Sequence, residues 1–210
     1  MLNFPESTKV HKRIPKEAFY RHLPLSAALK EKFVSDVETI IVENSLKKEN
    51  LNLADDSGVR EIILLSIKLK KQDFDKKLVE AIARQNLHKL VFLLAYEDKC
   101  QLAVYHGKLY RTEWIKEKDL TLTLSGNTLA EIWDDLIRQI AISSEAVLNQ
   151  KEHTVNEQLK IQDEMNRLNK LIQKTEKAAW KETQPKKRFA IYTRLKEYKT
   201  QLEELTNGKA

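Results

Sequence analysis

The chain has 210 residues, of which 41% are hydrophobic and 32% charged, with a formal net charge of +6 at pH 7. This length is typical of one domain with an appendage, since single domains usually have about 100–150 residues. No segment approaches the roughly 18 uncharged apolar residues of a membrane span, and a single cysteine, Cys100, excludes an internal disulfide. We therefore expect a cytoplasmic protein with no membrane partner, in which Cys100 is a small core residue.

The first 24 residues contain three of the four prolines and predict an ordered arm, with a short helix in the stretch KEAFYRHL. After this arm, Ser26 is a suitable N-cap for a helix, because apolar residues recur at helical spacing from Leu29 onward. The later half of the stretch, VETIIVENSL, is rich in β-branched residues. Residues 37–46 are therefore either the end of the helix or a first strand.

A β-α-β unit is expected between residues 59 and 97. The turn NLADDSG precedes an apolar strand at 59–70, a helix capped near Asp73 follows, and a second apolar strand, KLVFLLAYE, completes the unit. Apolar strands joined by a helix usually lie parallel inside a sheet. The pattern predicts a mixed sheet with flanking helices.

Three more strands and a closing helix are expected beyond this unit. The stretch QLAVYHGKLYRTEWI predicts two strands around a tight turn, and LTLTL alternates like a half-buried strand. The apolar period then changes from 2 to 3.6 at SGNTLAEIWDDLIRQIAI, where Thr128 and Glu131 have capping-box spacing. We expect this helix to complete an α+β core domain, residues 1–145, that includes the N-terminal arm.

The remaining residues, 146–210, carry two heptad stripes on either side of Pro185. The first stripe consists of Ile161, Met165, Leu168, Ile172, Thr175 and Ala179, and the second of Ile191, Leu195, Tyr198, Leu202 and Leu205. A proline between two stripes favours a chain reversal, so the sequence predicts a basic antiparallel helical hairpin. A parallel coiled coil, which would make the protein a homodimer, is the alternative arrangement.

No motif for a cofactor or an activated nucleophile is present. Four scattered glycines exclude a Walker A loop and a dinucleotide fingerprint, and the five histidines lack the spacing of zinc ligands. We therefore predict no cofactor, no metal site and no catalytic residue.

The strand EIILLSIKLKK raises the question of a nuclease, because magnesium nucleases commonly place an acid two residues before a lysine on one strand. Here Ser66 stands two residues before Lys68, and Lys68 two residues before Lys70, so the pattern fails. The lysines either mark where the strand leaves the core or line a phosphate-facing edge. A divergent metal-dependent nuclease would have to use the carboxylates of Asp55, Asp56 or Glu61.

The basic residues gather near the C-terminus, because residues 151–210 hold a net charge of +5 and residues 1–150 only +1. Around the expected turn, Trp180 and Phe189 bracket a cluster that predicts a site for phosphate or for an acidic protein face. The candidate binding residues are Lys177, Lys181, Lys186, Lys187, Arg188, Arg194, Lys196 and Lys199. Tyr105, Tyr110 and Trp114 alternate with basic residues and are either a base-stacking surface or inward-facing core residues.

Several phrases together resemble the bacterial and archaeal family known as domain of unknown function 4391. They are FPESTKVHKRIPKEAFY, LKEKFVSDVETI, REIILLSIKLK, LVEAIARQNLHKLVFLL, YRTEW and RFAIYTRLKEYKTQLEEL, so the resemblance runs nearly end to end. The resemblance implies a place beside helicases, DNA methyltransferases and restriction enzymes in phage-defence clusters, and it assigns no catalytic residue.

Three functions are consistent with these observations. The first is a non-enzymatic accessory subunit of a DNA-acting phage-defence or restriction-modification complex, which docks on a helicase, a DNA methyltransferase or a restriction subunit. Its basic hairpin would contact DNA or that partner. The alternatives are a stand-alone nucleic-acid-binding module and the divergent nuclease.

Overall fold

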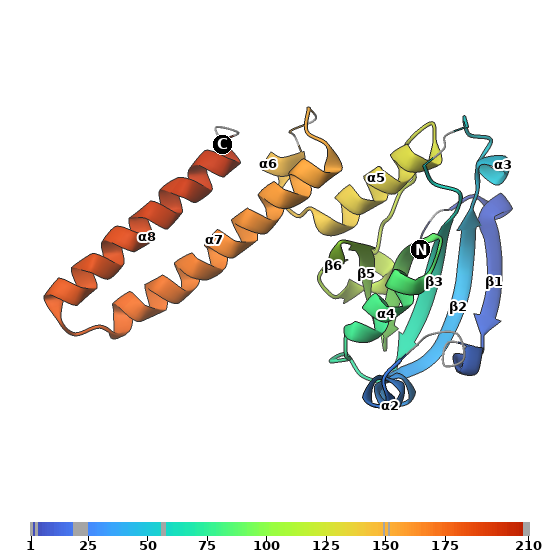
Figure 1. The fold of residues 1–210 in the computed structure, drawn as a ribbon, viewed down its shortest axis with the longest axis horizontal. Helices are drawn as coiled ribbons and strands as arrows, with labels where there is room; N and C mark the ends of the chain where they lie inside the picture. The colour runs from blue at the N-terminus through green and yellow to red at the C-terminus, as the bar shows by residue number, and fades with distance from the viewer. Residues whose placement is uncertain are drawn as a thin grey trace. The chain divides into compact units, whose positions relative to one another are not determined.

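The computed structural model describes residues 2, 4–18, 25–55, 58–148, 150 and 152–207. The chain divides into two compact units, Met1–Ala141 and Ile142–Ala210. The first unit is an α+β domain and the second a helical hairpin, which confirms the predicted fold class (Figure 1).

The described part of the first unit contains a seven-stranded mixed sheet in the order β1-β2-β3-β4-β5-β6, with β7 beside β5. Only β3 and β4 are parallel, and the helix α4 (Lys77–Gln85) connects them, as the predicted β-α-β unit requires. The strands are β1 (Lys9–Ile14), β2 (Val37–Leu46), β3 (Ile62–Leu69), β4 (Lys89–Tyr96), β5 (Lys99–His106), β6 (Lys108–Arg111) and β7 (Ile115–Lys116). The other helical segments are η1 (Glu6–Thr8), α2 (Ala27–Asp36), α3 (Lys48–Leu51), η2 (Glu117–Asp119) and α5 (Leu129–Ala141).

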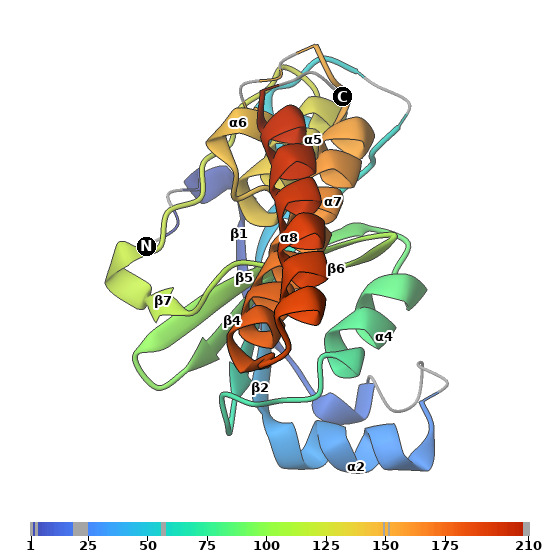
Figure 2. The same cartoon turned by 90° about the vertical axis from the view of Figure 1, so that its left-hand side faces the viewer.

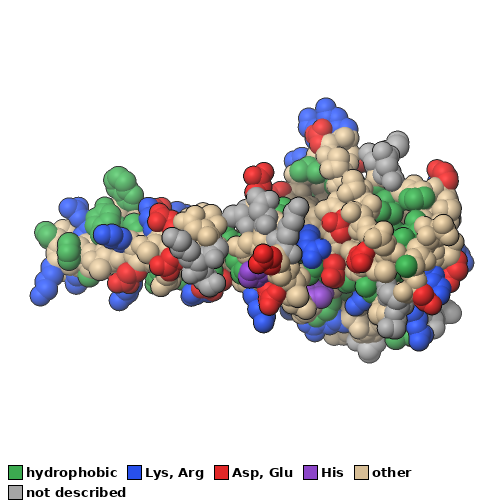
Figure 3. Space-filling view, turned by 90° about the horizontal axis from the view of Figure 1, so that it is seen from above, with side chains coloured by type: hydrophobic (Ala, Val, Ile, Leu, Met, Phe, Trp, Pro, Cys, Tyr) green, Lys and Arg blue, Asp and Glu red, His purple; other side chains and the backbone are tan. Residues whose placement is uncertain are grey.

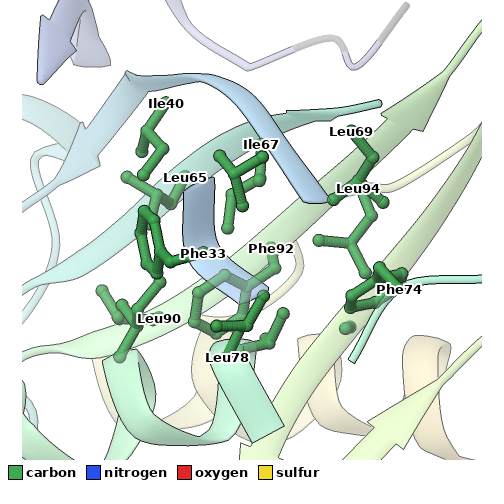
Figure 4. Packing of buried hydrophobic residues seen from close by; sticks show 14 of the residues in the cluster. Phe33, Ile40, Leu65, Ile67, Leu69, Phe74, Leu78, Leu90, Phe92 and Leu94 are labelled. Carbon is green, nitrogen blue, oxygen red and sulfur yellow. The ribbon is translucent and has the colours of Figure 1, made fainter. Parts of the chain in front are cut away.

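The main core lies between one face of the sheet and the helices α2 and α4. Phe33 of α2 and Leu78 of α4 pack with Leu65, Ile67 and Phe92 of the central strands, and all five are buried (Figure 4). The other face of the sheet receives α5, because Lys89, next to inward-facing Leu90, places its ammonium 5.6 Å from the Trp133 ring centre. Both faces of β3 and β4 are thus covered, which explains their continuous apolar sequences.

The N-terminal half contains one strand that the sequence does not predict. The predicted arm contains a strand, β1, which pairs antiparallel with β2. Residues 16–18 of the expected KEAFYRHL helix are helical, and its residues 19–23 lie outside the described part of the chain. The stretch 27–46 is a helix to Asp36 and a strand from Val37, as the β-branched alternative proposed.

Two later predictions also need correction. The helix α4 begins at Lys77 rather than near Asp73, and the carboxylate of Asp75 accepts the backbone N–H of Lys77 at 3.0 Å. The stretch LTLTL, residues 120–124, is not a strand, although Leu120 and Leu122 are buried and Thr121 and Thr123 exposed. The side-chain amide of Gln139 in α5 bonds both the N–H and the C=O of Thr123, at 3.0 and 2.9 Å, where a neighbouring strand would.

In the second unit, α7 (Val155–Lys181) and α8 (Pro185–Thr206) run antiparallel beside one another (Figures 1 and 2). Residues from both heptad stripes are buried or half-buried along the pair, with Leu168 and Leu195 among the buried ones. Residues 182–184 make the reversal, and Pro185 opens α8, where its missing N–H leaves no helical bond unmade.

Two buried glutamines hold the start of this unit. Gln162 of α7 accepts the N–H groups of Ser143 and Ser144 at 3.1 Å, just before α6 (Glu145–Leu148). Gln158 donates to the carbonyls of Val147 and Gln150, also at 3.1 Å. These four backbone groups are therefore paired with side chains of α7.

Candidate functional site

The carboxylates of the nuclease hypothesis are paired with basic side chains. Asp55 forms an ion pair with Lys48 at 2.9 Å, and Asp56 lies outside the described residues. Glu61 accepts from Ser45 and lies 3.6 Å from the Lys47 ammonium and 3.2 Å from the His88 imidazole. Within the described chain, no group of three or more His, Cys, Asp or Glu is arranged to hold a metal ion.

Three lysines at and just after the end of β3 bind the junction between α2 and β2. Lys68 pairs with Glu38 at 2.9 Å, and Lys70 donates to the carbonyl of Val34 at 2.9 Å. Lys71 lies 2.7 Å from the carboxylate of Asp36, whose side chain is fully buried. The interpretation that these lysines mark the end of a core strand fits this arrangement, since each is engaged within the domain.

Asp36 is the carboxylate that this junction depends on. Burial alone would raise its pKa, but hydrogen bonds from Lys71, from the Ser35 hydroxyl and from the N–H of Asp75 outweigh burial and lower the pKa. The ionised carboxylate thus connects the end of α2 to residues that follow β3.

Tyr105 of β5, Tyr110 of β6 and Trp114, which follows β6, all make contacts within the first unit. The hydroxyl of Tyr105 accepts from Arg84 at 2.8 Å, and the ammonium of Lys108 lies 4.9 Å from the centre of the Tyr110 ring. Trp114 packs against the main core. These contacts favour the interpretation of core and cross-strand residues over that of a base-stacking surface.

The residues on either side of the reversal form the strongest concentration of positive charge. We call residues 170–199 the hairpin end; it holds ten Lys and Arg and three acids, a net charge of +7. All eight predicted binding residues lie here and are exposed. Lys199 is also paired with Glu176 of α7, at 2.8 Å.

Two lysines that the sequence analysis missed extend this charge along α7. Lys170 and Lys174 are exposed and continue a series with Lys177 and Lys181 at intervals of four, three and four residues. This spacing places all four on one face of a helix, which we call the lysine stripe. The heptad spacing that predicts the buried residues of α7 also predicts that these four lysines share one exposed face.

Three large aromatic side chains are exposed at the hairpin end. Trp180 is 86% exposed, Phe189 75% and Tyr192 48%. Figure 3 shows hydrophobic side chains exposed among basic ones in this part of the second unit. Exposed rings of this size among cations are typical of a binding surface rather than of a solvated helix face.

The ion pair between Glu176 and Lys199 shows that these rings share one side of the hairpin. Glu176 is four residues before Trp180 and so shares its face of α7, and Lys199 is seven residues after Tyr192 and shares its face of α8. Phe189 is three residues before Tyr192 and joins the same face. We call Trp180, Phe189 and Tyr192 the aromatic side of the hairpin.

A shallow groove of about 490 Å³ lies between the two helices of the hairpin end. Lys187, Arg194 and Tyr198 of α8 line it, together with Lys174 and Ala178 of α7. Because none of the three rings of the aromatic side lines this groove, the groove and the aromatic side are separate surfaces that both carry positive charge.

The fold and this site define a class of protein: an α+β domain followed by a basic helical hairpin with exposed aromatic residues. Residues 2–202 match the family model described as Domain of unknown function (DUF4391), and the chain belongs to that family. No curated protein and no solved structure matches the chain at a significant level. Among the helices that the structure describes, none is both long and apolar enough to cross a membrane.

Proposed function

We propose that the protein is a non-enzymatic accessory subunit of a DNA-acting phage-defence or restriction-modification complex. The first unit docks on a helicase, a DNA methyltransferase or a restriction subunit, and the hairpin end contacts the DNA on which that partner works. Such a complex acts in the cytoplasm.

The observation that carries this proposal is the net charge of +7 on the exposed hairpin end. A concentrated basic surface attracts the phosphate backbone and releases its counterions, which favours binding to nucleic acid whatever its sequence. The paired carboxylates of Asp55 and Glu61 give no comparable support to a nuclease.

A charge reversal tests the contact with DNA. Replacing Lys186, Lys187 and Arg188 by glutamate in the full chain should weaken binding to a labelled DNA duplex by about tenfold or more. The matched control, Lys30→Glu with Lys32→Glu and Lys118→Glu, makes the same change of charge at exposed residues of the first unit. Equal effects of the two triple variants would contradict a site at the hairpin end.

Affinity purification of the tagged protein from its native host tests the partner. Half of the samples are treated with nuclease before mass spectrometry, so that proteins held only through DNA are removed. A helicase or methyltransferase that is retained after nuclease treatment would support the proposal that the protein is an accessory subunit of a complex. Recovery of the protein alone, with duplex binding intact, would instead favour the stand-alone nucleic-acid-binding module.

A further inference from the structure

The exposure of Trp180 is unusual within this chain. The chain has three tryptophans, of which Trp133 is only 4% exposed and Trp114 packs against the main core, whereas Trp180 is 86% exposed. An indole ring normally contributes to stability by burying its apolar area. A ring left in water at the end of a long helix contributes almost nothing to the stability of this fold. A role in binding therefore explains the exposed Trp180 better than a role in stability does.

Positive charge is interleaved with the rings of the aromatic side. On α8, Lys196 is seven residues after Phe189 and four after Tyr192, so all three share one face of the helix. On α7, Lys177 precedes Trp180 by three residues and lies near its face. Rings and cations therefore alternate along one side of the hairpin end.

This alternation matches the chemistry of an unpaired strand of nucleic acid. Each nucleotide of such a strand offers a flat base that stacks on an aromatic ring and a phosphate that pairs with a cation. In a duplex the base faces are already stacked on one another, so a duplex uses the cations and leaves the rings in water. An acidic peptide would also use the cations, but its carboxylates do not stack on aromatic rings, so acidity alone does not account for the three exposed rings.

From these observations we propose that the aromatic side binds single-stranded nucleic acid, with bases stacked on Trp180 and Phe189 and phosphates held by neighbouring lysines. This inference rests on the proposed contact with DNA, and it adds that the site selects unpaired strands over duplexes. Of the proposed partners, a helicase exposes such strands when it separates a duplex.

The test measures the binding of two probes to the full chain: an oligothymidylate of about 20 nucleotides and a mixed-sequence duplex of equal length. This length exceeds the roughly 4–16 nucleotides that a common single-strand site covers. Trp180→Ala combined with Phe189→Ala should weaken oligothymidylate binding by about 30-fold or more, since each stacked base contributes about 1–3 kcal/mol. Duplex binding should change by less than about twofold. Val34→Ala with Leu87→Ala, which truncates two exposed apolar residues of the first unit, is the control.

A second readout follows the indole ring itself. Oligothymidylate should quench tryptophan fluorescence in the parent chain, and Trp180→Phe should remove that quenching while it retains most of the affinity, because Phe also stacks on a base.

The outcomes separate this inference from the proposed function. Equal affinity for both probes, with no effect of the aromatic substitutions, would overturn the single-strand site and leave the DNA contact standing. Binding to neither probe would overturn both. Tight binding of polyglutamate in place of oligothymidylate would assign the surface to an acidic protein and overturn the inference.

Discussion

At the scale of single residues, Asp36 is a buried charge that joins separate segments of the first unit. Its buried carboxylate holds Lys71 at 2.7 Å and the N–H of Asp75 at 3.0 Å. Asp36→Asn removes the charge but retains the size of the side chain, and it should destabilise the protein by about 2–4 kcal/mol at neutral pH. Urea unfolding followed by circular dichroism measures this difference.

The pH dependence of that difference has a definite sign. The folded-state pKa of Asp36 is lowered, so its stabilising contribution is present above the unfolded pKa of about 3.9 and is lost as the pH falls through the folded value. The gap between the parent chain and Asp36→Asn should therefore shrink below about pH 4. A gap that stays constant down to acid unfolding would show that the carboxylate charge does not stabilise the junction.

The binding residues of the hairpin end could be predicted from the sequence, whereas the ion pair at the α2–β2 junction could not. Charge density and heptad spacing are local patterns, so the eight binding residues and the breaker at Pro185 could be predicted from neighbours in the chain. Asp36 and Lys71 are far apart in sequence and meet only because β2 and β3 pair. Nothing close to either residue in sequence indicates the other.

At the scale of elements, the start of α5 depends on Gly126. Its φ is +145°, a value that residues with a side chain rarely adopt, and an added Cβ would lie 2.8 Å from the Cβ of Glu131 and 2.9 Å from the nitrogen of Ile132. Gly126→Ala should cost about 2–4 kcal/mol of stability. Gly107, with φ +71° but nothing within 4 Å of an added Cβ, is the control, and Gly107→Ala should cost about 1 kcal/mol.

Thermal unfolding of the two alanine variants measures this contrast. Similar losses of melting temperature would show that the backbone angle alone matters, and that the close approach of Gly126 to α5 does not.

The elements that the sequence failed to predict share a physical cause. In β1 the side chains of Lys9–Arg13 are all exposed, so no alternation of burial marks it as a strand, and only its pairing with β2 does. In residues 120–124 the alternation of burial was predicted correctly, but a strand also needs a backbone partner. Here the amide of Gln139 takes that place. The apolar pattern of a sequence thus predicts well which residues are buried. It predicts less well which backbone segments pair with one another.

At the scale of the whole molecule, the uneven distribution of charge makes salt the most informative variable. Duplex affinity of the full chain should fall linearly on a double-logarithmic plot against salt concentration. Reversal of Lys186, Lys187 and Arg188 should reduce the magnitude of that slope by about 3, one for each lost phosphate contact. A slope that the reversal leaves unchanged would place the phosphate contacts elsewhere on the chain.

The exposed position of β1 has a consequence for self-association. As the first strand of the sheet, β1 pairs with β2 on one side, and among the described strands none pairs with its other side. An open edge of this kind can template the growth of aggregates from strand to strand. Here the irregular register between Lys9 and Lys12, with His11 at a φ of 44°, breaks the regular ladder, and Lys9, Lys12 and Arg13 repel an identical edge. The exposed, charged side chains of β1 give it no alternating pattern by which the sequence could predict a strand. The same side chains oppose fibril formation at this edge.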